Sequence, residues 1–336
     1  MWQYAGGASR TAGDRTHWSA VGPDDLLRPD GAGRPWAPPE ADAPGPPGSP
    51  VATPPAPTPA PGGDAPVRLP AALRPMTFGA QLDGGYDAVR ARPRDLLLLA
   101  AVFVVPVQLV VAFLNREALA EGGNLLDEAI FHAGASDADG SLLGPILGVG
   151  GSWLAHTLAA AAIAHTITAW YTGRHPSVGE ALGVVRRRWL PLVGAWALVH
   201  LLELIGVLGL VVGSVAVMAL LLPTVPAMVV EDLGPVRGVR RASELTRPRF
   251  GYVVGISLVS GALAWIIGHA LGAVPQLIGV AIGPDAGWVL LGLGKIVADV
   301  VMISVSASTT VLVYLDLRIR QEGLDLEWAA AERLPT

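Results

Sequence analysis

The chain has 336 residues, of which 51% are hydrophobic and only 15% are charged, and its formal net charge is −5. Soluble domains carry roughly 25% charged residues, so this composition is typical of a membrane protein. The negative net charge gives no support for a nucleic-acid partner. The absence of cysteine excludes disulfides, thiolate metal sites and a cysteine nucleophile.

Residues 1–72 show no apolar periodicity and have a centre rich in proline, alanine and glycine. Such a segment cannot bury enough apolar surface to offset the entropy of ordering it, so we expect a disordered cytoplasmic tail. Trp2, Trp18 and Trp36 are unusual in such a tail. They are either sporadic aromatic residues or short docking motifs for a protein partner.

Six later stretches are apolar over about 20 residues, the length that crosses ~30 Å of hydrocarbon as a helix. They are residues 95–114, 146–171, 189–208, 210–230, 252–271 and 288–315. Whether the fifth continues past Pro275 to residue 282 is left open. Pro223 and Pro226 are expected to kink the fourth. The predicted fold is all-α.

The predicted architecture is a polytopic bundle of six transmembrane helices within residues 73–330, followed by a short cytoplasmic C-terminus, 331–336. Arginines concentrate at the span ends that share a side with the tail, whereas the outer loops carry only Arg116. By the positive-inside rule both termini are cytoplasmic. The Ala, Gly, Pro and Arg bias is typical of a GC-rich bacterial genome, so we expect a bacterial cytoplasmic membrane.

Three short amphipathic helices are predicted before the first, third and fifth spans. The first covers residues 77–92, the second starts at Ser177, and the third starts near Asp232. Ser177 and Glu180 have capping-box spacing, whereas Asp232 is expected to be the N-cap of the third helix. The helices are either parts of a threefold repeat or independent elements.

These helices have apolar residues opposite arginines, which is typical of helices lying in the membrane interface. The arginines are therefore expected to contact the phosphates of anionic lipids. The candidates are Arg90, Arg92, Arg94, Arg186, Arg187, Arg188, Arg237, Arg240 and Arg241.

Three segments resemble one known family. They are PAMVVEDLGPVRGVRRASELTRPRFGYVVGI, LVYLDLRIRQEGLDLEWA and RPMTFGAQLDGGYDAVRARPRD. They are similar to bacterial six-span proteins labelled as the membrane domain of glycerophosphoryl diester phosphodiesterase, over roughly residues 75–330. In the bifunctional members the phosphodiesterase is a separate soluble barrel whose metal is held by Glu, Asp and His. This chain lacks that barrel and its motif, so the resemblance implies a membrane domain without a catalytic residue.

Ionisable residues inside hydrocarbon are costly and therefore mark candidate functional positions. Within the predicted spans they are His156, His165, His200, Glu203, His269, Lys295 and Asp299. His200 and Glu203 share a helix face, as do Lys295 and Asp299. Glu203 and Lys295 are predicted ~9 and ~11 Å from the outer edge of the hydrocarbon. Glu203 and Lys295 could therefore pair, and together with His200 and Asp299 they would form a candidate polar cluster in the outer half of the membrane.

Two other interpretations of these residues are open. Lys295 and Asp299 could form a structural ion pair within one helix, with the histidines hydrogen-bonded at helix contacts. A metal site of His156, His200, Glu203 and Asp299 is the other, although no HExxH-like spacing supports it. We predict no metal and no cofactor.

No catalytic motif is present, so the first functional hypothesis is a non-catalytic membrane module. It would scaffold or regulate a membrane complex through lipid contacts and a protein partner of the tail. The alternative is a transporter or lipid-handling protein that uses the polar cluster, and the second alternative is an intramembrane enzyme acting on phospholipid. A water-accessible cavity at Glu203, Lys295 and Asp299 favours the two alternatives, and tight packing there favours the module.

Overall fold

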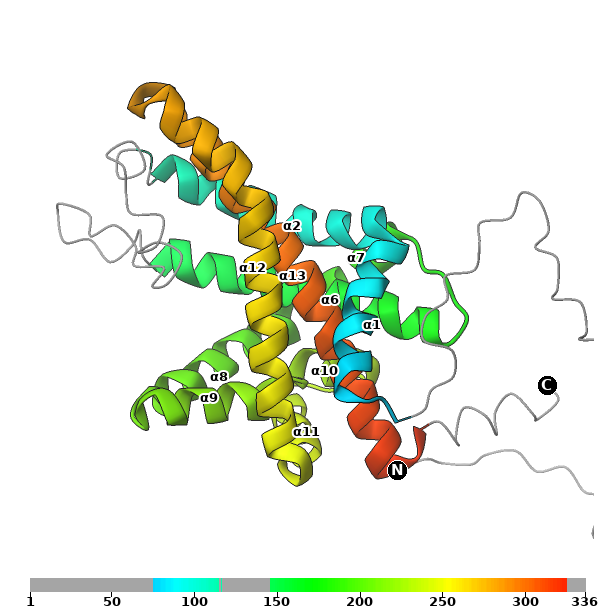
Figure 1. Ribbon diagram of the computed structural model, residues 1–336. Helices are drawn as coiled ribbons and strands as arrows, with labels where there is room; N and C mark the ends of the chain where they lie inside the picture. Colours follow the sequence, from blue (N-terminus) through cyan, green and yellow to red (C-terminus); the bar gives the residue numbers. More distant parts are fainter. Residues whose placement is uncertain (1–74, 115, 117–145, 325–336) are drawn as a thin grey trace, which may run out of the picture. The chain divides into compact units, whose positions relative to one another are not determined.

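Helices make up nearly all of the chain that the computed structural model describes, residues 75–114, 116 and 146–324, and these residues contain no strand. In chain order they are α1 (Phe78–Ala91), α2 (Pro93–Leu114), the π-helical turn η2 (Ile146–Gly150), α6 (Gly151–Tyr171), α7 (Val178–Arg187), α8 (Trp189–Val207), α9 (Leu210–Leu221), α10 (Thr224–Val230), α11 (Pro235–Thr246), the 3₁₀ turn η3 (Arg247–Arg249), α12 (Phe250–Ile282) and α13 (Pro284–Glu322) (Figure 1). The predicted tail, nearly all of the first outer loop and the C-terminal residues 331–336 lie outside the described residues.

Five helices are long and apolar enough to cross a membrane, as expected for a membrane protein with an all-α fold. They are Pro93–Leu114 (α2), Trp189–Val207 (α8), Val212–Val230 (α9 and α10 taken together), Pro235–Ile282 (α11, η3 and α12 taken together) and Ala286–Glu322 (α13). The helix at the second predicted span, α6, is not among them. His156, His165 and three threonines lower its mean hydropathy although it is 21 residues long.

The fourth and fifth predicted spans both contain prolines, but the helix is broken in the fourth and continuous in the fifth. The fourth is broken, because α9 ends at Leu221 and α10 begins at Thr224, with Pro223 between them. Proline has no N–H and disrupts the hydrogen bonding of the preceding turn. In the fifth, α12 continues through Pro275 and ends before Gly283, whose φ of 97° favours glycine.

The short helices before the spans are α1, α7 and α11, and their caps differ. Ser177 and Glu180 form the predicted capping box of α7: the Ser177 hydroxyl accepts from the Glu180 N–H at 3.2 Å. The prediction that Asp232 caps α11 is wrong. Asp232 has a φ of 52°, and the Leu233 N–H donates to the Met228 carbonyl at 3.1 Å. This pattern ends α10, as in a Schellman motif.

Helix α11 begins three residues later than the predicted cap. Gly234, in extended conformation, precedes it, and Pro235 occupies its first turn, where the missing N–H costs no hydrogen bond. Glu231 does not cap this helix either; it lies in the turn that follows α10.

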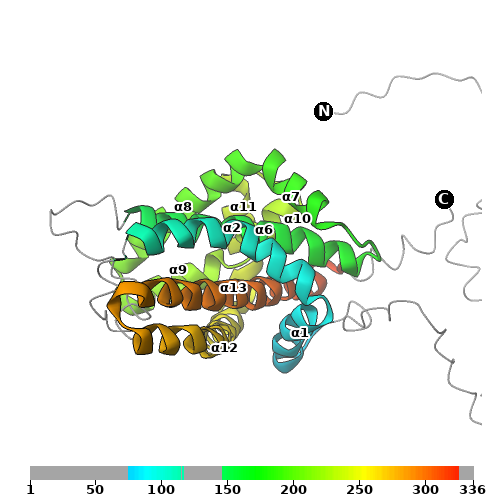
Figure 2. The same cartoon turned by 90° about the horizontal axis from the view of Figure 1, so that it is seen from above.

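Each short helix packs against the end of an even-numbered span. Helix α7 contacts α6, α11 contacts α10, and α1 contacts α13, so the first short helix reaches the last span of the chain (Figures 1 and 2). Gly85 of α1 lies against Thr309 of α13, and Gly238 of α11 lies against Met228 of α10. A side-chain carbon at either glycine would overlap the side chain of its neighbour, so one of the two residues would have to shift.

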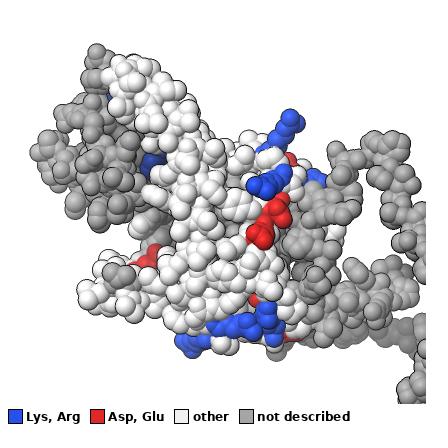
Figure 3. Space-filling model, in the orientation of Figure 1, with Lys and Arg blue, Asp and Glu red and all other residues white. Residues whose placement is uncertain are grey.

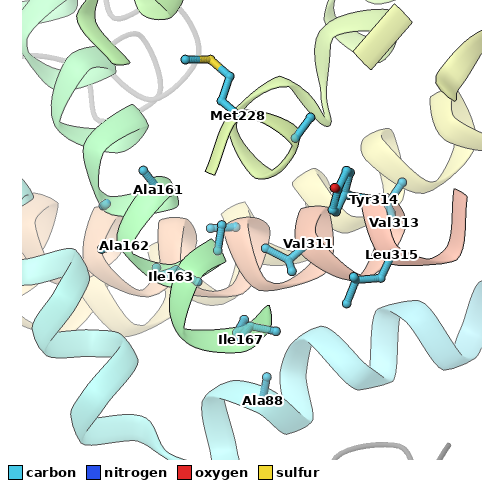
Figure 4. Packing of buried hydrophobic residues seen from close by; sticks show 14 of the residues in the cluster. Ala88, Ala161, Ala162, Ile163, Ile167, Met228, Val311, Val313, Tyr314 and Leu315 are labelled. Atoms are coloured by element: carbon cyan, nitrogen blue, oxygen red, sulfur yellow. The ribbon is translucent and has the colours of Figure 1, made fainter. Parts of the chain in front are cut away.

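Helix α13 is the centre of the bundle and packs against α12, α2, α1 and α6. Figure 4 shows Ile163 and Ile167 of α6 beside Val311 and Leu315 of α13, with Ala88 of α1 close by. All five are fully or almost fully buried. In Figure 3 charged side chains gather where α1 and α11 lie, whereas α12 contains no charged residue and presents an apolar surface.

Candidate functional site

Lys295 and Asp299 form a buried ion pair on the central helix. The Lys295 Nζ lies 3.1 Å from both oxygens of Asp299, whose exposed fraction is 1%. The Gln108 amide of α2 donates to Asp299 Oδ2 at 2.5 Å and to Ser152 Oγ at 3.3 Å. Ser152 donates in turn to the carbonyl of Gly148 in η2 at 2.6 Å. The ion pair therefore joins α13 to α2 and to the start of α6.

His200 and Glu203 form a second polar pair, on α8. His200 Nδ1 lies 2.6 Å from Glu203 Oε2, and the two side chains are 24% and 30% exposed. The Trp153 ring of α6 lies 4.4 Å from the imidazole at 30°, and the Trp196 ring lies 5.7 Å away with its edge toward it. An ionised carboxylate only accepts, so Nδ1 carries the proton toward Glu203. Nε2 of a neutral His200 is then an acceptor.

The structure forms two separate pairs instead of the candidate four-residue cluster, and the Lys295–Asp299 pair within one helix is the alternative interpretation given above. In the described part of the chain, Glu203 makes its ion pair with His200, and Lys295 makes its ion pair with Asp299. The depth estimate considered position along the membrane normal but not the neighbours of each helix. Helix α8 packs mainly on α9, α11 and α6 rather than along α13.

Two adjoining cavities lie beside the His200–Glu203 pair, and we call them together the cleft. Their volumes are about 310 and 180 Å³, and both are lined by Thr157, His200, Leu222 and Val225. The walls come from α6, α8, the α9–α10 break and α13. Glu203 lines the smaller cavity, whereas Lys295 and Asp299 line neither.

The hydroxyl groups of the cleft are oriented by their own helices. Thr157, Ser306 and Thr310 each donate to the carbonyl four residues earlier, at 2.9, 2.8 and 2.8 Å, and Thr224 donates to the Leu221 carbonyl at 2.6 Å. A hydroxyl has one proton and two lone pairs. These oxygens therefore offer lone pairs, and not protons, to a molecule in the cleft.

Several of the nine candidate arginines form hydrogen bonds, ion pairs or ring contacts with other residues of the protein. Arg188 donates to the carbonyls of Met228 and Leu233 at 2.5 and 2.6 Å and pairs with Asp232 at 2.8 Å. Arg92 lies 5.7 Å from the centre of the Trp170 ring. Such arginines hold helices together, so a role as lipid contacts is secondary for them.

Six of the nine candidate arginines are accessible. The Arg240 side chain is 75% exposed although it lies 3.3 Å from Glu244 on the same helix. Five more arginines are exposed on the short helices or just after them: Arg90, Arg94, Arg186, Arg187 and Arg237.

Glu231 is the centre of an ion-pair network between α11 and the end of α13. Arg241 donates from Nε to both Glu231 oxygens at 3.0 and 2.8 Å, and its Nη2 lies 2.5 Å from Glu322. The Tyr314 hydroxyl donates to Glu231 at 2.9 Å, and Arg318 pairs with Glu322 at 2.8 Å. This network is structural: it fixes the turn between the second and third pairs of spans.

A second contact of this kind fixes the start of α1. The backbone N–H of Met76 donates to Asp316 at 2.7 Å, and Arg320 donates to the Met76 carbonyl at 2.6 Å. Asp316 is fully buried and also pairs with Arg320. The sequence alone did not suggest this long-range contact.

The residues that sequence reasoning missed are those that surround each pair. Gln108 is the one amide inside α2, and its position in an apolar span was a signal that could have been used. Trp153, Trp196 and Ser306 carried no comparable signal, because aromatic and hydroxyl residues are ordinary in membrane helices. Their role depends on the neighbouring helix.

In the described residues, no group of three or more His, Cys, Asp or Glu side chains is arranged to hold a metal ion. Comparison of the chain with protein-family models, with curated proteins and with solved structures finds no match.

Proposed function

We propose that this chain is a six-span protein of the bacterial cytoplasmic membrane that binds an amphipathic molecule of the bilayer in the cleft. The cleft beside His200 and Glu203 is the observation that carries this proposal. It offers polar acceptors and aromatic rings next to an apolar wall, a combination typical of ligand pockets. The chemistry is binding, with no catalytic step.

The sixth span in this proposal is α6. At about 1.5 Å per residue its 21 residues extend for about 32 Å, enough to cross the hydrocarbon. The concentration of arginine on one side supports cytoplasmic termini. Because the chain has no cysteine, Ser141→Cys and Thr172→Cys are unambiguous probes. Only Ser141→Cys should react with an impermeant maleimide added outside intact cells, and reaction of both or of Thr172→Cys alone refutes the topology.

Guest binding is favoured over the other two functions by the surroundings of the polar pairs. The Lys295–Asp299 pair is enclosed by Gln108, which supports a structural role there. Glu203 lines a cavity, which a scaffold does not need. The phospholipid enzyme is less favoured, because Glu203 and Asp299 belong to different networks and do not face one substrate.

A second candidate function is the non-catalytic scaffold or regulatory module. The exposed arginines support it, since each is worth about 1 kcal/mol against an anionic lipid surface. In this proposal the short helices contact anionic lipids and residues 1–72 bind a protein partner. The motifs quoted above support membership of the six-span family labelled as the phosphodiesterase membrane domain, and both functions are compatible with that membership.

The test of guest binding compares two serines on α13. Ser306 lines the cleft, whereas Ser304, two residues earlier, is fully buried. In micelles of the uncharged detergent dodecyl maltoside, which carries no ammonium group, we expect Ser306→Cys to react with N-ethylmaleimide about tenfold faster than Ser304→Cys, because reaction requires access to the thiol. Octanol, octyltrimethylammonium and octyl sulfate are then added separately, and at least one should slow the reaction.

Leu258→Cys on the lipid-facing surface of α12 is the control, since Leu258 is 47% exposed and lies outside the cleft. Protection of Ser306→Cys without protection of Leu258→Cys supports the proposal. Failure of all three amphiphiles to protect, or equal protection at both positions, overturns it.

A further inference from the structure

We propose that the guest of the cleft carries an ammonium group, held by the Glu203 carboxylate between Trp153 and Trp196. This inference rests on the guest-binding function proposed above. It specifies the chemical class of the guest, which an apolar cavity alone would leave open.

Charge is the first argument. Among the described residues that line the cleft, Glu203 is the only carboxylate, and there is no arginine or lysine. One carboxylate oxygen accepts from His200, and no described residue donates to the other, Oε1. A carboxylate charge within a membrane-spanning helix is costly without a partner. A cation in the cleft would supply it, whereas an anionic group placed directly against Glu203 would be repelled, so the phosphate of a zwitterionic head group would have to lie away from this carboxylate.

The polarity of the other lining groups is the second argument. Thr157, Thr224, Ser306 and Thr310 have donated their protons to backbone carbonyls, so their oxygens act as acceptors. A neutral His200 offers Nε2 as a further acceptor. A guest that carries donors or positive charge matches this lining, whereas a guest that needs to accept hydrogen bonds does not.

The aromatic rings are the third argument. Trp153 and Trp196 flank His200, and both line the cleft. Tryptophan attracts cations over its ring face more strongly than tyrosine or phenylalanine does, and the attraction grows when water is excluded. An ammonium at the His200–Glu203 pair would lie beside His200, whose ring is 4.4 and 5.7 Å from these two rings.

The size of the cleft decides how much of the guest enters it. Cavities of about 310 and 180 Å³ hold a head group and the first carbons of a chain, but not a whole lipid. Leu222, Val225 and Ile303 provide an apolar wall for those carbons. The rest of the chain would lie along α8, where Leu201 and Leu204 are 55% and 66% exposed.

The closing experiment uses the Ser306→Cys protection assay with amphiphiles of equal chain length. Octyltrimethylammonium should protect at a concentration about tenfold lower than octanol, and octyl sulfate should protect least. Adding Glu203→Gln should bring the ammonium and the alcohol to within about threefold of each other. Because Glu203→Gln could also disturb folding, Trp153→Leu is a second variant, expected to lower the ammonium preference about threefold.

The outcomes separate this inference from the function on which it rests. Equal protection by all three head groups overturns the ammonium inference and leaves guest binding intact. An ammonium preference that survives both Glu203→Gln and Trp153→Leu overturns the assignment to these residues. Protection by none of the amphiphiles overturns both proposals.

Two sources could supply such a group, an aminophospholipid head group or a free hydrophobic amine. Native mass spectrometry of protein released from nanodiscs with equal phosphatidylethanolamine and phosphatidylglycerol distinguishes them. Preferential retention of phosphatidylethanolamine, lost in Glu203→Gln, assigns the aminophospholipid. Equal retention of the two lipids, together with octyltrimethylammonium protection, assigns the free amine.

Discussion

Two polar pairs of this protein have the same spacing in the sequence but differ in burial and in the groups that surround them. Lys295–Asp299 and His200–Glu203 are both pairs of ionisable residues one helical turn apart in an apolar helix. Asp299 is 1% exposed and accepts from Gln108 of a second helix. Glu203 has a side chain that is 30% exposed and faces a cavity.

The difference follows from the position of each helix in the bundle. Helix α13 is surrounded by α12, α2, α1 and α6, so its polar groups meet partners from other helices. Helix α8 is peripheral and lies beside the α9–α10 break, where Leu221, Leu222 and Thr224 line the cleft. A broken helix does not fill the space beside its neighbour as a continuous helix would, and the polar pair there remains accessible.

The largest effect is expected at the enclosed pair. Asp299→Ala leaves the Lys295 ammonium without its partner, and breaking a buried ion pair costs 3–5 kcal/mol. We expect a loss of about 3 kcal/mol in the free energy of unfolding, the lower end of this range, because the Lys295 side chain is 21% exposed. Unfolding of the detergent-purified protein by titration with sodium dodecyl sulfate measures the loss.

The double variant Lys295→Met with Asp299→Leu is the matched control. Replacing both members of a buried pair by apolar residues is often neutral, so most of the lost stability should return. If the double variant is as unstable as Asp299→Ala, the lost packing of Asp299 and not the unpaired lysine explains the effect.

A smaller effect is expected when the partner from the second helix is removed. Gln108→Leu deletes the donor to Asp299 and to Ser152, and a hydrogen bond to a charged group contributes about 1.5–3 kcal/mol. Thr157→Val is the counterpart in the cleft, where its hydroxyl binds only its own helix. It should change stability by no more than about 0.5 kcal/mol. If the two variants have equal melting temperatures, the Lys295–Asp299 pair is no more enclosed than the cleft, and the comparison of the two sites is wrong.

The sequence predicted features that depend on residues close together in the chain, such as helix lengths and a helix cap. It did not predict features that depend on contacts between helices. The length of the apolar runs located five helices that are long and apolar enough to cross a membrane, and the spacing of Ser177 and Glu180 located a capping box. Asp232 was assigned to the wrong helix end, because an acidic residue between two helices can belong to either. Its φ of 52° shows that it belongs to the end of α10.

The sequence identified the four residues of the two polar pairs, but it did not show which pair is enclosed by other helices. Spacing along a helix identified His200 with Glu203 and Lys295 with Asp299. Which pair is enclosed depends on contacts between segments far apart in the chain, such as Gln108 with Asp299, and the spacing of residues holds no information about them. The same limit explains why Arg188 and Arg241, predicted as lipid contacts, bind groups of the protein instead.

The smallest effect on stability is expected at Glu203, the residue on which the proposed binding depends most. Glu203→Gln keeps the shape of the side chain and an amide oxygen that accepts from His200 Nδ1. Partly exposed pairs contribute about 0–1 kcal/mol, so the free energy of unfolding should change by less than about 1 kcal/mol. The same titration that is used for Asp299→Ala measures it.

A loss as large as that of Asp299→Ala would mean that Glu203 is also enclosed in solution, and the cleft would then be too closed to admit a guest. A small loss, combined with loss of the ammonium preference, would separate the two pairs by function: one holds the bundle together, and the other is available for binding.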